Sequence, residues 1–206
     1  GVTTISASGH NVTLDTATNN FAAAVGITGA TVAVVDEDAI VLGASTVSGA
    51  YSVTAGGAVT NSGTLVIPGT TTISASGHAV TLGDSSNNFG TTAITGANVA
   101  ITDTNAIILG ASTVSGTYSV TAGGAVTNSG TQEITGVTTI SASGHNVTLD
   151  TATNNFAAAV GITGATVAVV DEDAIVLGAS TVSGAYSVTA GGAVTQSGAL
   201  AITGAT

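Results

Sequence analysis

The chain carries one long stretch of sequence twice. Residues 1–60 recur without a single change at 136–195, and a diverged copy lies between them. Three histidines, spaced 68 and then 67 residues apart, mark the same place in each copy: His10, His78 and His145. Tandem repetition indicates units that bury their apolar faces only by stacking on one another. We therefore expect one continuous structure with internal repeats 1–68, 69–135 and 136–206, a window of a longer repeat array.

A shorter period of glycines runs inside each copy. These glycines recur about every 20 residues, and every third interval is 7 or 8 residues longer: Gly1, Gly29, Gly49, Gly69, Gly96, Gly116, Gly136, Gly164, Gly184 and Gly204. Between them stand short β-branched runs, such as 31–35 and 39–42, which are bounded by Gly, Asn, Asp and Ser. Such runs predict strands, about three in each unit. No window keeps the 3.6-residue period of a helix, so the predicted class is all-β.

Three strands in each unit of about 20 residues predict a parallel β-solenoid. Each unit would form one coil, and each strand would stack on its copy in the next coil. A propeller blade is excluded because it needs about 40–45 residues. Stacked strands lie about 4.8 Å apart, so the nine intervals between these glycines predict a rod roughly 43 Å long. The 7–8 extra residues of every third coil are expected to leave the rod as a loop.

The inward-facing positions stay open at this stage. Ile5 and Ala7 alternate with hydroxyl residues, and Val32 and Val34 also alternate with other residues. Counted from the preceding glycine, however, the two sets are one position out of step. Either a bulge absorbs one residue, or one of these apolar faces points outward. The sequence therefore leaves open which residues face inward in the coil that contains Val32 and Val34.

The charge of the chain excludes several kinds of partner. It has no Lys or Arg and eleven acidic residues, which gives a net charge of −11. Binding to a nucleic-acid backbone or to an anionic membrane surface requires basic residues, so we expect neither. No run approaches the 18 or so apolar residues of a transmembrane helix. No basic segment followed by an apolar stretch marks a signal peptide.

Acidic turns are the first candidates for a binding site. Three adjacent carboxylates stand at two equivalent turns, where their oxygens could collect Ca²⁺: Asp36, Glu37, Asp38, Asp171, Glu172 and Asp173. The middle copy has Asp103-Thr104-Asn105 instead, and the glycine-rich nonapeptide of calcium-binding β-rolls is absent. We therefore expect at most weak, non-specific calcium binding, and no other cofactor.

Catalysis is not expected from this sequence. Equivalent histidines are three coils apart, or about 14 Å, whereas metal–nitrogen bonds are about 2 Å long. The acidic turns recur identically, but a catalytic cleft is normally found in one place only. There is also no basic residue to stabilise an anionic intermediate. We therefore predict that the protein is not an enzyme.

The extra residues of each copy end in Asn-Asn-Phe. If they form loops outside the rod, they are candidates for contact with a partner: Asn19, Asn20, Phe21, Asn87, Asn88, Phe89, Asn154, Asn155 and Phe156. The partner would be a host or matrix glycan, or a neighbouring filament. This is the alternative hypothesis, in which the chain belongs to an adhesin.

Four motifs give the chain a recognisable character: Asn-Asn-Phe, Ile-Thr-Gly-Ala, Thr-Ile-Ser-Ala-Ser-Gly-His and Val-Thr-Ala-Gly-Gly-Ala-Val-Thr-Asn-Ser-Gly. They resemble the repeat regions of filamentous-haemagglutinin-type bacterial exoproteins and related giant surface adhesins. The resemblance spans the whole chain. It implies a right-handed parallel β-helix, export to the cell surface, and a stalk or fibre role in adhesion or biofilm.

We therefore predict a structural repeat segment of an extracellular bacterial fibre. The segment would be a rigid β-helical rod that serves as a stalk or scaffold. Open strand edges at the ends of such a rod favour pairing unless they are capped. The expected partner is thus the protein itself, end to end and laterally in a filament.

Overall fold

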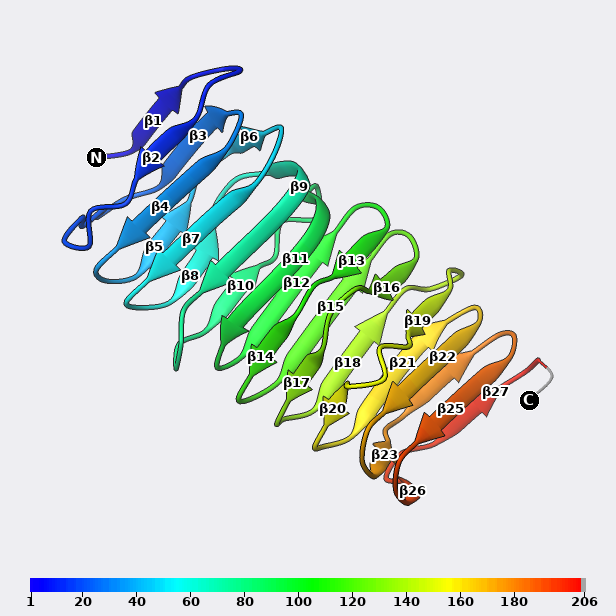
Figure 1. Ribbon diagram of the computed structural model, residues 1–206. Coiled ribbons are helices and arrows are strands. Elements are labelled where there is room, and N and C mark those ends of the chain that lie inside the picture. Colours follow the sequence, from blue (N-terminus) through cyan, green and yellow to red (C-terminus); the bar gives the residue numbers. More distant parts are fainter. Residues whose placement is uncertain (205–206) are drawn as a thin grey trace.

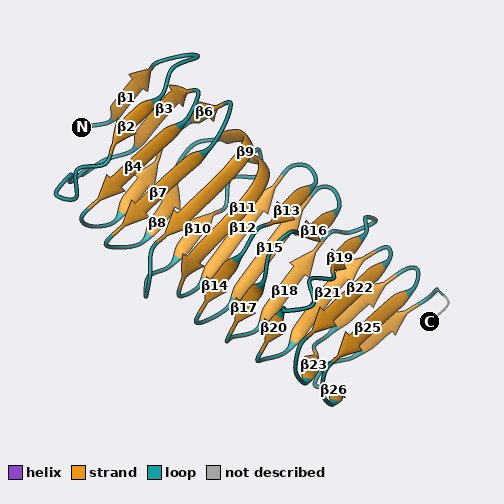
Figure 2. Cartoon of the chain, in the orientation of Figure 1, coloured by secondary structure: helices purple, strands orange, loops and turns teal. Residues whose placement is uncertain are grey.

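The computed structural model describes residues 1–204, which form 27 β-strands and no helix. The strands lie across a rod, and each is parallel to its neighbours in adjacent turns (Figures 1 and 2). The chain makes about 10 turns. At about 4.8 Å per turn, these turns give a rod roughly 48 Å long. The predicted all-β parallel solenoid is confirmed.

Two columns of stacked strands make up the faces of the rod. The first face contains β1 (Thr3–Ser6), β3 (Val25–Gly29), β5 (Ile40–Leu42), β8 (Val59–Asn61), β10 (Val80–Leu82), β12 (Val99–Asp103), β15 (Tyr118–Ala122), β18 (Thr138–Ser141), β21 (Val160–Gly164), β23 (Ile175–Leu177) and β26 (Val194–Gln196). The second face contains β2 (Val12–Leu14), β4 (Val32–Asp36), β7 (Tyr51–Ala55), β9 (Leu65–Ser74), β11 (Asn88–Gly96), β13 (Ile107–Leu109), β16 (Val126–Asn128), β19 (Val147–Leu149), β22 (Val167–Asp171) and β25 (Tyr186–Ala190).

Six further strands extend one face or the other: β6 (Ser45–Val47), β14 (Ser112–Val114), β17 (Gln132–Ile134), β20 (Asn155–Phe156), β24 (Ser180–Val182) and β27 (Leu200–Ile202). Strands β5 and β6 both pair with β3, so they lie on the same face and are separated by a kink at Gly43 and Ala44. Strands β9 and β11 pass from the first face to the second. The first residues of β9 pair with β6 on the first face and with the first residues of β11, whereas the last residues of β9 pair with β7 on the second face.

Successive copies of the repeat are half a turn out of step. The equivalent strands β4, β12 and β22 lie on the second, first and second face in turn. Each copy of 67 or 68 residues therefore makes about three and a half turns of about 20 residues.

The 7–8 extra residues supply this half turn and are not a simple insertion. The second of the extra stretches continues into β11, where Asn88 and Phe89 pair with Val66 and Ile67 in the turn before. The predicted loop outside the rod was therefore wrong for these residues. In the second copy only the bend at 83–87 lies between the strands, whereas in the first copy residues 15–24 form no strand.

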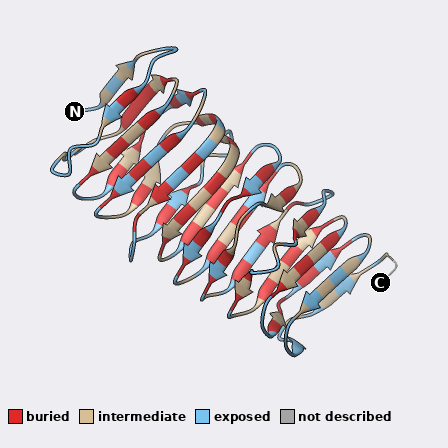
Figure 3. Ribbon diagram, viewed as in Figure 1, coloured by how far each residue is buried: buried red, intermediate tan, exposed pale blue. Residues whose placement is uncertain are grey.

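The core runs along the inside of the rod, and buried and outward-facing residues alternate along the strands (Figure 3). Val32 and Val34 are both buried, and Val34 pairs with Val53, which pairs with Ile73. Ile73 is the buried equivalent of Ile5 in the second copy. Both apolar sets therefore face inward. The two sets are out of step when counted from the preceding glycine because the corners before their strands differ in length. No bulge is needed to explain the difference.

Candidate functional site

The acidic turns stabilise the backbone through their first carboxylate. Asp36 is buried, its Oδ2 accepts a hydrogen bond from the N–H of Phe21 at 2.8 Å, and its Oδ1 accepts one from the N–H of Asp38 at 2.9 Å. Asp171 makes the same two bonds to Phe156 and Asp173. These carboxylates join the corner after one strand to the Asn-Asn-Phe stretch of the turn before.

The middle copy shows that this role does not depend on a run of acidic residues. Asp103 accepts hydrogen bonds from the N–H groups of Phe89, at 2.6 Å, and Asn105, at 2.7 Å. Burial raises the pKa of this carboxyl, and the two backbone hydrogen bonds lower it in part. Each copy of the repeat thus has one buried aspartate at this corner, and it is a feature of the fold. The sequence alone did not distinguish it from its exposed neighbours.

The remaining acidic side chains of the turns face solvent. Glu37 Oε1 and Asp38 Oδ2 accept hydrogen bonds from the amide of Asn20, at 3.2 and 3.1 Å. Within residues 1–204, no group of three or more His, Asp or Glu side chains is placed to hold a metal ion. Calcium binding at Glu37, Asp38, Glu172 and Asp173 stays a prediction, while Asp36 and Asp171 already bind the backbone through both oxygens.

The first asparagine of each internal Asn-Asn-Phe stretch lies inside the coil. The Oδ1 atom of Asn87 accepts hydrogen bonds from the N–H of Leu65, at 2.9 Å, and from Nδ2 of Asn61, at 3.0 Å. Its Nδ2 donates to the carbonyl of Leu82 at 3.3 Å. Asn154 makes the equivalent bonds in the next copy, to Gln132, Asn128 and Leu149. The recurring Val-Thr-Asn-Ser-Gly motif, which contains Asn61 and Asn128, was the only sign in the sequence of these hydrogen bonds to Asn87 and Asn154.

The phenylalanines of these stretches also belong to the core. Phe89 and Phe156 are both 1% exposed, and Phe21, in the first turn, is half-buried. Of the residues expected to contact a partner, only the middle asparagines point away from the core: Asn20, Asn88 and Asn155. Any partner of these stretches would therefore meet amide groups and not an aromatic ring.

The three histidines lie at exposed corners. Each follows a glycine with positive φ, of 76° at Gly9, 77° at Gly77 and 78° at Gly144. An L-residue rarely adopts this backbone conformation, so glycine is required there. The N–H of His10 donates to the carbonyl of Ala7 at 2.9 Å and closes the turn. The Ser-Gly-His motif is thus accounted for by the shape of a corner.

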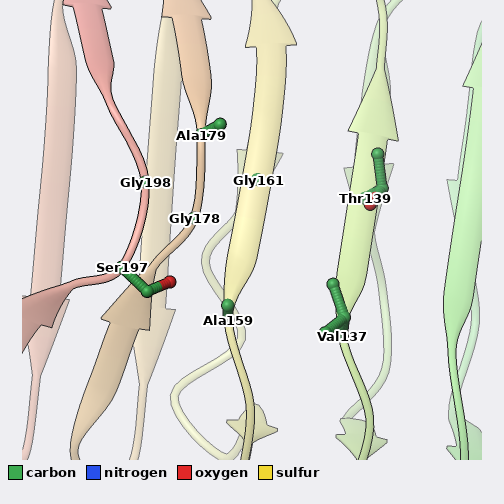
Figure 4. Close-up of a pocket in the computed structure, with 8 residues that line it drawn as sticks. All are labelled: Val137, Thr139, Ala159, Gly161, Gly178, Ala179, Ser197 and Gly198. Atoms are coloured by element: carbon green, nitrogen blue, oxygen red, sulfur yellow. The ribbon is translucent and has the colours of Figure 1, made fainter.

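A shallow pocket lies on the first face near the C-terminal end of the rod (Figure 4). It encloses about 410 Å³ and has no charged lining residue: Val137, Thr139, Ala159, Gly161, Gly178, Ala179, Ser197 and Gly198. The middle copy has Ala93 at the position of Gly161. The pocket brings together none of the predicted site residues.

The interior also holds tyrosines, and they predict an alkaline limit to stability. Burial raises the pKa of Tyr51 and Tyr118 well above the ordinary value of about 10. Because the folded-state pKa is the higher one, this stability is complete below about pH 10 and is lost as the pH rises further. We expect the Tm to fall above about pH 10 and tyrosinate absorbance to appear only on unfolding. Thermal melts across that range, with Tyr118→Phe as the control that weakens the fall, check this. Titration of both tyrosines in the folded chain near pH 10 would contradict it.

A family model covers the whole chain in four consecutive matches, at residues 1–28, 29–95, 96–163 and 164–206, and is described as repeats of unknown function (DUF5649). The chain belongs to this family. The matched DUF5649 repeats have the same period as the copies 1–68, 69–135 and 136–206, but they start at a different residue. The repeats 29–95 and 96–163 begin where the extra half turn of each copy ends. No curated protein and no solved structure matches the DUF5649 chain. The residues described in the structure form no helix that could cross a membrane.

Proposed function

We propose that this DUF5649 segment is a structural rod, part of an extracellular bacterial fibre in which it serves as stalk or scaffold. The observation that carries the proposal is the uninterrupted ladder of parallel strands through about 10 turns. Each turn is held to the next by backbone hydrogen bonds along the axis, and the core fills the interior throughout. Such a structure gains length by adding copies, each worth about 17 Å.

The use of the recurring polar residues supports a role without catalysis or a cofactor. Asp36, Asn87 and their equivalents hold backbone groups of adjacent turns, and the histidines close corners. The buried polar side chains of Asp36 and Asn87 are therefore used by the fold itself. Their repetition matches a requirement that every copy shares, which is the stacking of one turn on the next.

The composition supports a position outside the cell. The chain has no Lys or Arg and therefore offers no bond to trypsin-like proteases, and it has no Cys, Met or Trp. Cysteine and methionine are the side chains that oxidants convert most readily. The resemblance of the repeats to filamentous-haemagglutinin-type exoproteins supports the same location.

Two measurements test the proposal. Antibodies against the 206-residue chain are expected to label intact cells of the source organism along extended surface structures. A variant that lacks the 67 residues 69–135 is expected to form a rod shorter by about 17 Å in electron micrographs. Label confined to permeabilised cells would overturn the extracellular role. A rod of unchanged length would overturn the scaffold.

The adhesin hypothesis makes a different prediction for the outward-facing amides. If the fibre binds a glycan through them, alanine at Asn20, Asn88 and Asn155 abolishes retention on immobilised matrix glycans and leaves the rod intact. A scaffold without this activity shows the same retention before and after the changes.

A further inference from the structure

Two threonine hydroxyls lie in successive turns inside the rod without a protein partner. Thr71 and Thr92 are both 0% exposed, and the Oγ1 atom of each is buried with no hydrogen-bond partner among the described residues. A hydroxyl that gives up its bonds to water and gains none in return destabilises the fold. Buried polar groups in native proteins are therefore nearly always paired, either with protein or with ordered water.

The two threonines stand in register on adjacent strands. Thr71 in β9 pairs with Thr92 in β11, and the two strands are parallel. Neighbouring strands lie about 4.8 Å apart, so the two side chains enter the interior at about this separation. An O–H···O hydrogen bond is only about 2.5–3.0 Å long. The hydroxyls are not bonded to each other, but one water molecule with bonds of about 2.8 Å to each of them spans the distance.

The neighbours of this pair in the same column of inward-facing residues are larger. Tyr51 pairs with Thr71 in the turn before, and Leu109 pairs with Thr92 in the turn after. Both neighbours are fully buried. The two threonines are thus the smallest side chains of this part of the column, so the room that a water needs is greatest beside them. A buried water makes about two to four hydrogen bonds, and the two hydroxyls supply the lower number.

The other two copies of the repeat do not contain this pair. The position of Thr92 holds Val25 in the first copy and Val160 in the third, where they pair with Thr3 and Thr138. Both valines are 0% exposed, so a valine at this place is compatible with the stacking of the turns. The second copy therefore has a hydroxyl where a methyl group is sufficient for packing, and it lies next to a hydroxyl in the turn before.

We propose that the interior binds one ordered water molecule between Thr71 and Thr92. The water forms hydrogen bonds with both Oγ1 atoms and satisfies two groups that no described protein atom reaches. It bridges two successive turns at the place where β9 and β11 run along the second face. This junction thereby gains a contact along the axis in addition to the backbone ladder. The inference concerns the interior of the fold and does not depend on where the rod is located.

Valine substitutions test the bridge, because valine keeps the shape of threonine and removes only the hydroxyl. Thr92→Val takes one partner from the water and leaves the Thr71 hydroxyl buried alone. We therefore expect the Tm to fall by at least about 2–4 °C. In an interior without the water, the same change removes an unpaired hydroxyl and raises the Tm. Thermal unfolding of the 206-residue chain, followed by circular dichroism, measures the difference. A Tm that rises or stays unchanged would overturn the proposal.

Thr138→Val is the matched control. Thr138 is equally buried, and its Oγ1 atom also has no partner among the described residues, but its neighbour in the next turn is Val160. This neighbour has no hydroxyl with which to share a water. The substitution is therefore expected to leave the Tm unchanged or to raise it. A fall equal to that of Thr92→Val would refute a water that depends on the pair.

A double substitution distinguishes one shared water from two independent partners. If a single water bridges the pair, Thr71→Val added to Thr92→Val removes a hydroxyl that is already unpaired, so the double variant is at least as stable as Thr92→Val alone. Additive falls in the Tm would contradict the bridge. A high-resolution crystal structure of the unchanged chain is expected to show density for one water within hydrogen-bond distance of both Oγ1 atoms. An interior without that density would also overturn the proposal.

Discussion

Asn87→Ala is expected to lower the free energy of unfolding by about 3 kcal/mol or more. The substitution removes one acceptor shared by Leu65 N–H and Asn61 Nδ2, and one donor to the Leu82 carbonyl, from a site that is 0% exposed. The backbone N–H of Leu65 is then left buried without its partner, which costs more than the loss of an exposed hydrogen bond. Urea unfolding followed by circular dichroism measures the change.

The next residue supplies the control for this experiment. Asn88 points away from the core in the same stretch and is half-buried. Asn88→Ala is expected to change stability by no more than about 0.5 kcal/mol, as surface substitutions usually do. Equal effects of the two substitutions would contradict the interior position of Asn87.

Gly123→Ala is expected to prevent the corner after β15 from stacking on the turn before it. A Cβ atom at this position would overlap the carbonyl oxygen of Thr104 and lie 2.9 Å from its carbonyl carbon. Both are backbone atoms, so relief requires the two turns to separate, and this breaks ladder hydrogen bonds on either side. We expect a loss of several kcal/mol, at the upper end of single substitutions.

Gly83→Ala is the matched control for the glycine. A Cβ there has only Thr81 Cγ2 nearby, at 3.9 Å, and the equivalent positions in the other copies hold Asp15 and Asp150. Its thermal unfolding is expected to match that of the unchanged chain. If Gly123→Ala also left the Tm unchanged, close stacking of consecutive corners would be refuted.

The regular part of the fold could be predicted because its physical requirements repeat. A solenoid needs the same perimeter in every turn, so glycines such as Gly49 and Gly69 recur at a fixed spacing and the strands between them are short. The half turn in each copy could not be found in this way. Either an inserted loop or an extra half turn would lengthen the interval from Gly1 to Gly29. Only the pairing of β3 with β1 in the structure distinguishes these two explanations.

The polar interior was the other part that sequence reasoning missed. Asn87 and Asp103 stand among Ser, Thr and Gly, as exposed turn residues do, and nothing in their neighbours distinguishes a buried amide from a solvated one. Their burial becomes favourable only when backbone N–H groups of an adjacent turn point at them. Those N–H groups, of Leu65 and Phe89, are brought in by the stacking itself.

The orientation of the 4.8 Å strand spacing in the native assembly is the most direct test of the structural role. Cryo-electron microscopy or fibre diffraction measures it. A rod in which successive turns stack along the fibre axis places this spacing along the axis, with the strands across it. A 4.8 Å spacing perpendicular to the fibre axis, or its absence, would contradict the account.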